Sequence, residues 1–229
     1  MWFVLLGLRM SLVEIDETSA VIAALEAGGP SDPVAGQLPW SKRVFDVTLS
    51  TLLLGVLGCA VVALFVLNPF FIRGPLFFYQ RRMGLAGHPF RAVKFRSMRP
   101  AGVEARGAFD ALEEERISRF GGVMRKCRID ELPQIINVLR GEMSLIGPRP
   151  DLYEHACFYQ TNVPGYAARH QVMPGISGYA QTEVGYVDGE SGVQRKVAAD
   201  LFYVAHRNFR FDLWIAWRTI CVVAGRRGR

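Results

Sequence analysis

Residues 44–67 read VFDVTLSTLLLGVLGCAVVALFVL, and Asp46 is the only charged residue among them. About 20 consecutive apolar residues in a helix are enough to cross the hydrocarbon core of a bilayer. The alternative is a buried helix of a soluble domain, but such helices rarely lack a polar face over this length. We therefore predict a membrane-embedded helix within residues 41–72.

Basic residues flank the run on both sides: Lys42 and Arg43 before it, and Arg73, Arg81 and Arg82 after it. Lys and Arg concentrate on cytoplasmic flanks, so a simple span would place one basic flank outside. A helix that enters, breaks and returns keeps both flanks inside, and Gly55 and Gly58 would permit the break. We therefore predict a re-entrant helix with Lys42, Arg43 and Asp46 at the membrane interface.

The composition excludes several classes of protein. The chain has 229 residues, of which 50% are hydrophobic and only 21% charged, so most of it is not disordered. Its net charge of +6 fits either nucleic acid or an anionic membrane with phosphorylated substrates. The cysteines lack zinc-like spacing and are expected to be reduced thiols, which excludes a disulfide scaffold and a Cys/His zinc site. They are Cys59, Cys127, Cys157 and Cys221.

The N-terminal part is predicted to be an extension and linker over residues 1–40. Residues 1–9 are apolar but too short to span a bilayer, and they lack the basic start of a signal peptide; Met10 is a candidate start. Residues 14–27 have helical apolar spacing and stop at a Gly-Gly-Pro sequence, after which residues 28–39 resemble a linker.

Residues 73–224 are predicted to form a compact cytosolic catalytic domain, followed by a basic tail at 225–229. Its first part is basic and contains no acid, which indicates either phosphate handling or a solvated, headgroup-facing surface. Residues 109–117 are predicted to form a surface helix. Residues 198–224 interleave aromatic and basic groups, which suits an interfacial helix or a helix packed on the core. The predicted fold class is therefore α+β, mainly helical.

The sequence RIDELPQ at 128–134 predicts a helix start. Asp130 is a good N-cap, Pro133 is tolerated in the first turn, and the helix should stop at Gly141. A positive helix end and the basic residues upstream would hold Asp130 ionised, as a nucleophile or metal ligand requires. Asp130 and Glu131 together suit Mg²⁺. The alternative is that Asp130 is only a helix cap.

Two further motifs lie downstream. In Gly147-Pro148-Arg149-Pro150, the prolines form a rigid mount for a guanidinium that could bind a diphosphate, although an exposed turn is the alternative. Residues 169–181, RHQVMPGISGYAQ, contain glycines that permit close backbone approach to a ligand. His170 is expected to be structural.

Taken together, these motifs resemble the bacterial sugar transferase family, the small monotopic phosphoglycosyl transferases. The resemblance covers residues 41–222 and rests on several motifs in order. They are KRVFD at 42–46, KFRSM at 94–98, DELPQ at 130–134, NVLRGEMS at 137–144, GPRP at 147–150 and PGISGYAQ at 174–181.

The resemblance implies transfer of a sugar-1-phosphate from a UDP-sugar to a polyprenyl phosphate, undecaprenyl phosphate, with release of UMP. Asp130 would be the nucleophile that forms a covalent phosphosugar intermediate, and Glu131 would act beside it, with both carboxylates at a Mg²⁺ site. The implied substrate-binding residues are Lys94, Arg96, Arg128, Pro148, Arg149, Pro150, Arg169 and Gln181. The implied location is the cytoplasmic face of the bacterial inner membrane, where the lipid bilayer and downstream glycosyltransferases are expected partners.

Three features differ from the family pattern, and one of them is Cys127-Arg128-Ile129 before Asp130, where the family more often has Ser then Leu. The family carries Ser-Pro in the middle of its re-entrant helix, where this chain has Cys59-Ala60. The family's Val-Asn-Gly after Ala-Gln is replaced by Thr182-Glu183-Val184, which bears on the sugar accepted.

Two other functions stay open from the sequence. One is an inactive membrane scaffold or regulator of polysaccharide assembly. The other is nucleic-acid binding, which we do not expect, because the basic groups lie beside a lipid-facing run rather than among stacking aromatics.

Overall fold

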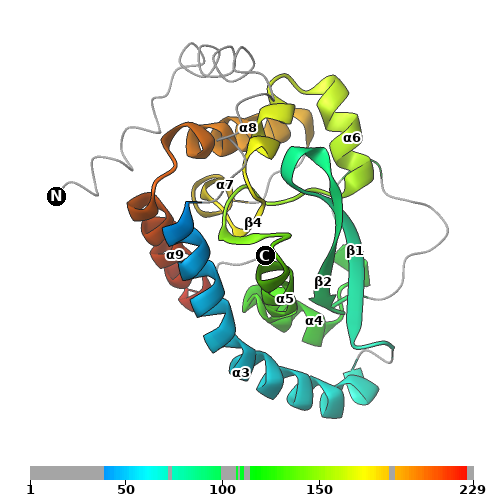
Figure 1. The fold of residues 1–229 in the computed structure, drawn as a ribbon. Helices are drawn as coiled ribbons and strands as arrows, with labels where there is room; N and C mark the ends of the chain where they lie inside the picture. Colours follow the sequence, from blue (N-terminus) through cyan, green and yellow to red (C-terminus); the bar gives the residue numbers. More distant parts are fainter. Residues whose placement is uncertain are drawn as a thin grey trace.

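The apolar run lies within α3 (Trp40–Phe71), a single uninterrupted helix in the computed structural model of the chain. The structure describes residues 39–71, 74–98, 107, 109–110, 114–185 and 189–225. The predicted helix at 14–27, the linker and the last four residues of the basic tail lie outside this part. Figure 1 shows α3 as a curved helix along the outside of the other elements.

The exposure of α3 distinguishes a membrane-embedded helix from a buried helix of a soluble domain. Among the described residues, α3 is the one helix long and apolar enough to cross a membrane, with a mean hydropathy of 2.6, and only 17% of that window is buried. A core helix would be mostly buried. The structure therefore agrees with a membrane-embedded helix and not with a buried one.

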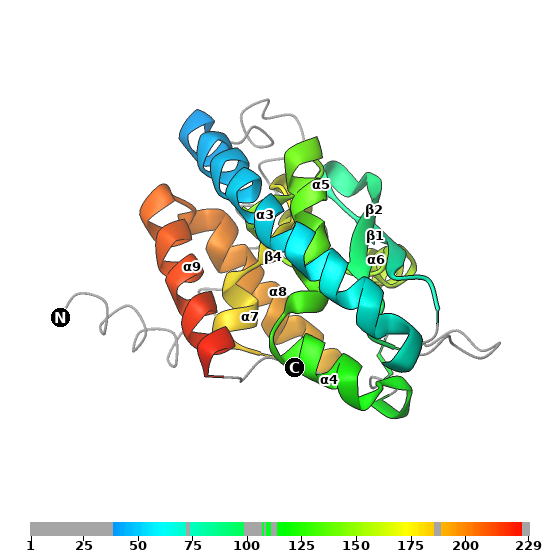
Figure 2. The ribbon, with the colours of Figure 1, turned by 90° about the horizontal axis from the view of Figure 1, so that it is seen from below.

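Both ends of α3 pack against the same body (Figures 1 and 2). Near its start, the ring of Phe45 lies 5.6 Å from that of Phe209, edge to face. At its end, Phe71 stacks on Phe120 at 4.8 Å. Between them, Leu57 and Leu64 are buried in an apolar cluster with residues of β2, α4 and α5.

After α3 the chain forms an antiparallel hairpin. β1 (Phe77–Met83) pairs with β2 (Pro89–Phe95) in a register that sets Phe77 opposite Phe95 and Met83 opposite Pro89. A short 3-10 turn, Leu85–Gly87, joins the strands. β2 then lies against the segment that carries the DELPQ motif, where it places Lys94.

The predicted helix start at 128–134 differs in detail. α4 (Arg119–Lys126) ends before it, and residues Ile129–Gln134 form a 3-10 helix that continues into α5 (Ile135–Arg140). The residue that precedes the 3-10 helix is Arg128, in a left-handed conformation (φ 57°), so Asp130 is not the N-cap. The predicted stop at Gly141 is confirmed, with φ at 80°.

A second, parallel pair of strands supports the GPRP motif. β3 (Ser144–Ile146) pairs with β4 (Gly175–Ser177), so Ile146 lies opposite Ser177. The strands approach closely beyond β3, because a Cβ on Gly175 would lie 2.1 Å from the backbone nitrogen of Gly147. α6 (Tyr153–Asn162), a 3-10 helix (Tyr166–Gln171) and α7 (Tyr179–Glu183) complete this region.

The aromatic stretch at 198–224 forms parts of two helices. α8 (Gly189–His206) ends before Asn208, whose side chain caps α9 (Phe209–Ala224). α9 packs on the core through Phe211 and Ile215, while Trp217 is 64% exposed, and an interfacial role for the helix stays a prediction. Of the predicted surface helix at 109–117, the structure describes a 3-10 turn at Glu114–Arg116.

The main apolar core is formed by residues of α5, β3, α7, α8 and α9, with Ile176 of β4 packed against it. A second apolar cluster joins α6 and the Tyr166–Gln171 turn to α8. The described part of the chain is thus mainly helical with two small sheets, which confirms the mixed, mainly helical fold class.

Candidate active site

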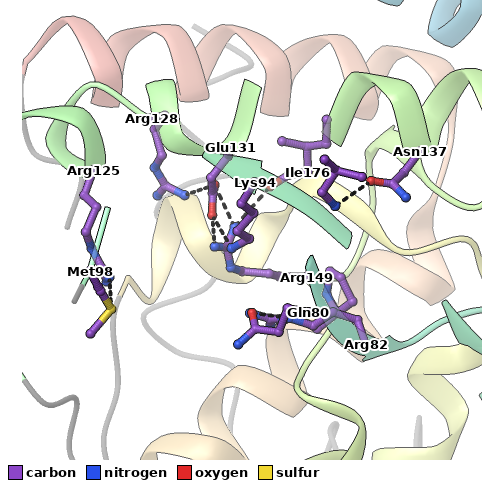
Figure 3. Close-up of polar contacts among 12 residues, drawn as sticks. Gln80, Arg82, Lys94, Met98, Arg125, Arg128, Glu131, Asn137, Arg149 and Ile176 are labelled. Atoms are coloured by element: carbon purple, nitrogen blue, oxygen red, sulfur yellow. Dashed lines mark hydrogen bonds and ion pairs between the residues drawn. The ribbon is translucent and has the colours of Figure 1, made fainter. Parts of the chain in front are cut away.

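Glu131 is the centre of a buried charge cluster, shown in Figure 3. Its carboxylate contacts three cations that come from separate parts of the chain: Lys94 of β2 at 3.1 Å, Arg128 at 3.2 Å, and Arg149 through two nitrogens. Burial opposes ionisation, but the charges of Arg149 and Lys94 outweigh it and hold the pKa of Glu131 well below its usual range. Burial also lowers the pKa of Lys94 to about 8, against the pull of Glu131.

Asp130 lies next to this cluster in a different environment. Its side chain is buried, and its Oδ1 atom has no hydrogen-bond partner in the described structure. Burial, together with the negative charge of Glu131, raises the pKa of Asp130 to about 6. Glu131 is thus the carboxylate that contacts the cations directly, while a pKa of about 6 still leaves Asp130 mostly ionised at neutral pH.

The backbone around Arg149 is held on one side by β4. Gly147 N donates to Ser177 O at 2.9 Å, and Gly175 N donates to Pro148 O at 2.9 Å. Pro150 O accepts from Arg82 Nη1 at 2.5 Å. The predicted rigid mount is thus built from strand contacts and an arginine as well as from the prolines.

Arg169 lies against the backbone of the GPRP segment. Its side chain is only 1% exposed, and it pairs with Asp151 and Asp200. It also donates to Arg149 O at 2.6 Å. In this structure the charge of Arg169 is paired and its side chain is buried, and its implied role in substrate binding stays a prediction.

His170 is buried beside Arg169, as expected of a structural histidine. Burial and the adjacent charge of Arg169 lower its pKa to about 3, so the imidazole is neutral at physiological pH.

Two other implied substrate ligands lie apart from the Glu131 cluster. Arg96 donates to Pro75 O at 3.1 Å and stacks over Phe78. Gln181 is on α7, where its Oε1 is buried without a hydrogen-bond partner in the described residues. The structure shows no contact that links either side chain to Glu131.

The residues predicted at the membrane interface fasten α3 to the domain. Lys42 is buried and contacts Asp212 at 2.6 Å and Ile146 O at 2.9 Å. Arg43 donates to Val138 O and Leu139 O of α5, and Asp46 accepts from Leu145 N at 3.1 Å. These contacts attach the first turns of α3 to α5, β3 and α9.

Sequence reasoning missed several residues that build the site. Arg82 appeared only as part of a basic cluster, and the four that surround Arg169 carried no prediction. They are Asp151, Tyr166, Lys196 and Asp200. Two signals were available: Asp151 directly follows the GPRP motif, and Lys196 and Asp200 are four residues apart on a helix.

The donors available for a metal are few. The described residues contain no group of three or more His, Cys, Asp or Glu side chains that could hold a metal ion. Within the described residues Asp130 Oδ1 has no hydrogen-bond partner, whereas both oxygens of Glu131 contact cations. This set fits a divalent cation that takes one or two carboxylates and completes its shell with substrate phosphates and water, as Mg²⁺ does.

Comparison with known proteins gives consistent results. Residues 38–226 match the model of the bacterial sugar transferase family. Over 211 residues the chain is 38% identical to the UDP-glucose:undecaprenyl-phosphate glucose-1-phosphate transferase of Caulobacter vibrioides, covering 88% of this chain and 76% of that protein.

Two other relatives are named for different sugars, one for N-acetylgalactosamine and one for glucose. An Aeromonas hydrophila UDP-N-acetylgalactosamine-undecaprenyl-phosphate N-acetylgalactosaminephosphotransferase is 37% identical over 78% of this chain. The Escherichia coli K12 UDP-glucose:undecaprenyl-phosphate glucose-1-phosphate transferase is 36% identical over 82%. The chain spans less than half of these two proteins, 42% and 41% of their lengths.

Proposed function

This chain belongs to the bacterial sugar transferase family, and from that membership we propose that it is a phosphoglycosyl transferase that moves a sugar-1-phosphate from a UDP-sugar to undecaprenyl phosphate. UMP is the other product. The resulting lipid-linked sugar starts the assembly of an exopolysaccharide, a capsule or another glycan, which downstream glycosyltransferases extend. Relatives named for both glucose and N-acetylgalactosamine leave the sugar to experiment.

The observation that carries the proposal is that the adjacent carboxylates of Asp130 and Glu131 have different environments. Glu131 is bound by Lys94, Arg128 and Arg149, while Asp130 keeps an oxygen that has no partner in the part of the chain that the structure describes. A nucleophile needs a free lone pair, and a diphosphate needs cations. Asp130 is therefore assigned as the nucleophile, and the cations around Glu131 as the diphosphate site.

The reaction then proceeds in two displacements. A carboxylate oxygen of Asp130 attacks the β-phosphorus of the UDP-sugar, a new O–P bond forms, and the bond to the bridging oxygen breaks so that UMP leaves. An oxygen of the lipid phosphate next attacks the same phosphorus and releases the Asp130 carboxylate. Lys94 and Arg149 stabilise the charge on the phosphate oxygens in both steps, since phosphoryl transfer depends mainly on positioning and electrostatics.

We include Mg²⁺ in the proposal as the cofactor, held by Asp130 and Glu131. When bound, it neutralises charge on the donor diphosphate and assists departure of UMP. Asp130 and Glu131 are the carboxylates that would hold it.

The proposed location is the cytoplasmic face of the inner membrane, with α3 re-entrant. The support is that both ends of α3 contact one domain, through Lys42 and Asp212 at its start and Phe71 and Phe120 at its end. A spanning helix would place one of these contacts on the far side of the bilayer. The exposed apolar side chains of α3 and α9 supply the surface that meets lipid.

The test is UMP release from a panel of UDP-sugars by detergent-extracted protein with Mg²⁺ and undecaprenyl phosphate. Asp130→Asn is the control, because it keeps the shape of the side chain and removes its nucleophilic charge. We expect release with one or a few sugars and a loss of about 1,000-fold or more in Asp130→Asn, with membrane association unchanged. Retained turnover in the variant would refute the nucleophile, and absent release with every sugar would refute the activity.

A further inference from the structure

We propose that Arg169 is a positioning residue, the centre of a buried clamp that fixes the backbone of Arg149 from the side opposite the substrate. The inference rests on the proposed function, in which Arg149 binds the donor diphosphate. The clamp consists of Arg169, Asp151, Lys196 and Asp200.

The first step is that every contact of the Arg169 guanidinium lies inside the protein. Nη2 donates to Arg149 O at 2.6 Å and lies 2.6 Å from an oxygen of Asp200. Nη1 contacts Asp151 and donates to Tyr166 Oη at 3.2 Å. With 1% of the side chain exposed, the guanidinium is placed to hold the loop.

The second step is that the contacts converge on three consecutive residues. Arg169 holds the carbonyl of Arg149, and Arg82 holds that of Pro150 at 2.5 Å. Asp151 is held by Arg169 and by Lys196 Nζ at 2.5 Å. The Arg149 guanidinium therefore projects toward Glu131 from a backbone fixed at successive positions.

The third step is the balance of charge. Arg169 and Lys196 carry two positive charges, and Asp151 and Asp200 carry two negative ones, so the buried group is neutral. Lys196 and Asp200 are one turn apart on α8, which ties the loop to that helix. A buried charge without its partner is strongly destabilising, so this arrangement favours one position of the loop.

The consequence concerns catalysis because a displacement of about 1 Å in a positioned group can cost about 100-fold in rate. Arg169→Lys keeps the charge but lacks the planar fork, so it cannot hold Arg149 O, Asp151 and Asp200 together. We expect this change to disturb Arg149 while the core remains folded.

The experiment is a double-mutant cycle between Arg169→Lys and Arg149→Ala, read as kcat and KM for UMP release. In the wild-type background, Arg169→Lys should lower kcat/KM about 10- to 100-fold. In the Arg149→Ala background, the same change should have less than a threefold effect, because Arg169 acts only through Arg149. Equal fold losses in both backgrounds would overturn the proposal. The effect of a general loss of structure, or of a lost contact between Arg169 and substrate, would multiply with the effect of Arg149→Ala.

A second variant tests the proposal if Arg169→Lys folds poorly. Asp200→Asn keeps the volume of the side chain and removes one carboxylate of the clamp, and it should show the same dependence on Arg149. Wild-type protein is assayed in parallel. If it releases no UMP, the proposed function fails, and the cycle is repeated with the equilibrium binding of UDP, where independent effects of the two changes would overturn the clamp alone.

Discussion

The guanidinium of Arg149 meets the carboxylate of Glu131 with both terminal nitrogens: Nη1 lies 2.9 Å from Oε2, and Nη2 contacts Oε1. Arginine binds a phosphate with the same fork geometry. Glu131 therefore takes the place that an anionic substrate would occupy among these cations. Binding of the donor would exchange one anion for another.

This arrangement predicts how Glu131→Gln behaves without substrate. The amide cannot neutralise Lys94, Arg128 and Arg149, and loss of one partner from a buried ion pair costs about 3–5 kcal/mol. We expect a lower melting temperature in detergent. Since UDP supplies the missing negative charge, it should raise the melting temperature more in the variant than in the wild type.

The matched control is Glu183→Gln, the same change at a pair that is more exposed. Glu183 contacts Arg218 at 3.1 Å, and the Arg218 side chain is 42% exposed. Surface pairs contribute about 0–1 kcal/mol, so its melting temperature should change little, with or without UDP. An equal response to UDP in wild type and Glu131→Gln would contradict the exchange of anions.

The sequence predicts the parts of this site that depend on neighbouring residues. The apolar run lies within α3, and Gly141 ends α5. Such features follow from length, helix-stop signals and the order of motifs, which are local properties of the chain.

The sequence does not predict which carboxylate takes the cations. Asp130 and Glu131 are adjacent and share the same basic neighbours in the sequence, and only the fold brings Lys94 and Arg149 to one of them. The burial of Arg169 is equally non-local, because Asp200 reaches it from another helix. Charge pairing depends on tertiary contacts that a motif does not encode.

The close approach of the Gly147 and Gly175 backbones gives a prediction on stability. A Cβ at Gly175 would lie 2.1 Å from Gly147 N and 2.5 Å from Gly147 O, and backbone atoms cannot move aside cheaply. Gly175→Ala should therefore destabilise the protein by about 3 kcal/mol or more and displace the GPRP loop.

Gly58→Ala is the control for that prediction. No atom of the described residues lies within 4 Å of a Cβ at Gly58 on α3, and alanine favours helix by up to about 1 kcal/mol. Melting in detergent should show a large loss for Gly175→Ala and an unchanged or higher midpoint for Gly58→Ala. Similar midpoints for both variants would show that the strands can separate without cost.

His170 predicts a dependence of stability on pH. Its pKa is about 3 in the folded protein and about 6.5 when exposed, so the unfolded chain binds the extra proton between these values. Stability from this group is complete above about pH 6.5 and is lost as the pH falls toward 3. Between pH 7 and pH 5 the loss is about 2 kcal/mol.

The measurement compares wild type and His170→Gln across that range. Other groups also titrate, but they do so in both proteins, so the difference in unfolding free energy reports His170. The advantage of wild type over the variant should shrink as the pH falls from 7 to 5. A constant difference would mean that the imidazole is not held neutral in the folded state.

The topology of α3 gives the last prediction. Lys42 at its start is paired with Asp212, and Phe71 at its end stacks on Phe120, so both ends face the domain that carries the active site. Trp40, which is 82% exposed, and Pro75 are accessible positions just outside these contacts. Single cysteines at the two positions, in a chain without its native cysteines, should react with a membrane-impermeant reagent from the same side.

A cysteine at Arg91, an exposed residue of β2, marks the side of the domain, and one at Leu52, 71% exposed in the middle of α3, marks the lipid. In inverted vesicles, positions 40, 75 and 91 should be labelled together and position 52 protected; in right-side-out vesicles, none should react. α3 is not broken at Gly55 or Gly58. A re-entrant topology therefore depends on how the whole helix lies against the domain, and the labelling experiment tests that placement. Labelling of positions 40 and 75 from opposite sides would establish a true span, and then the contacts of Lys42 and Phe71 with one domain could not both exist in the membrane.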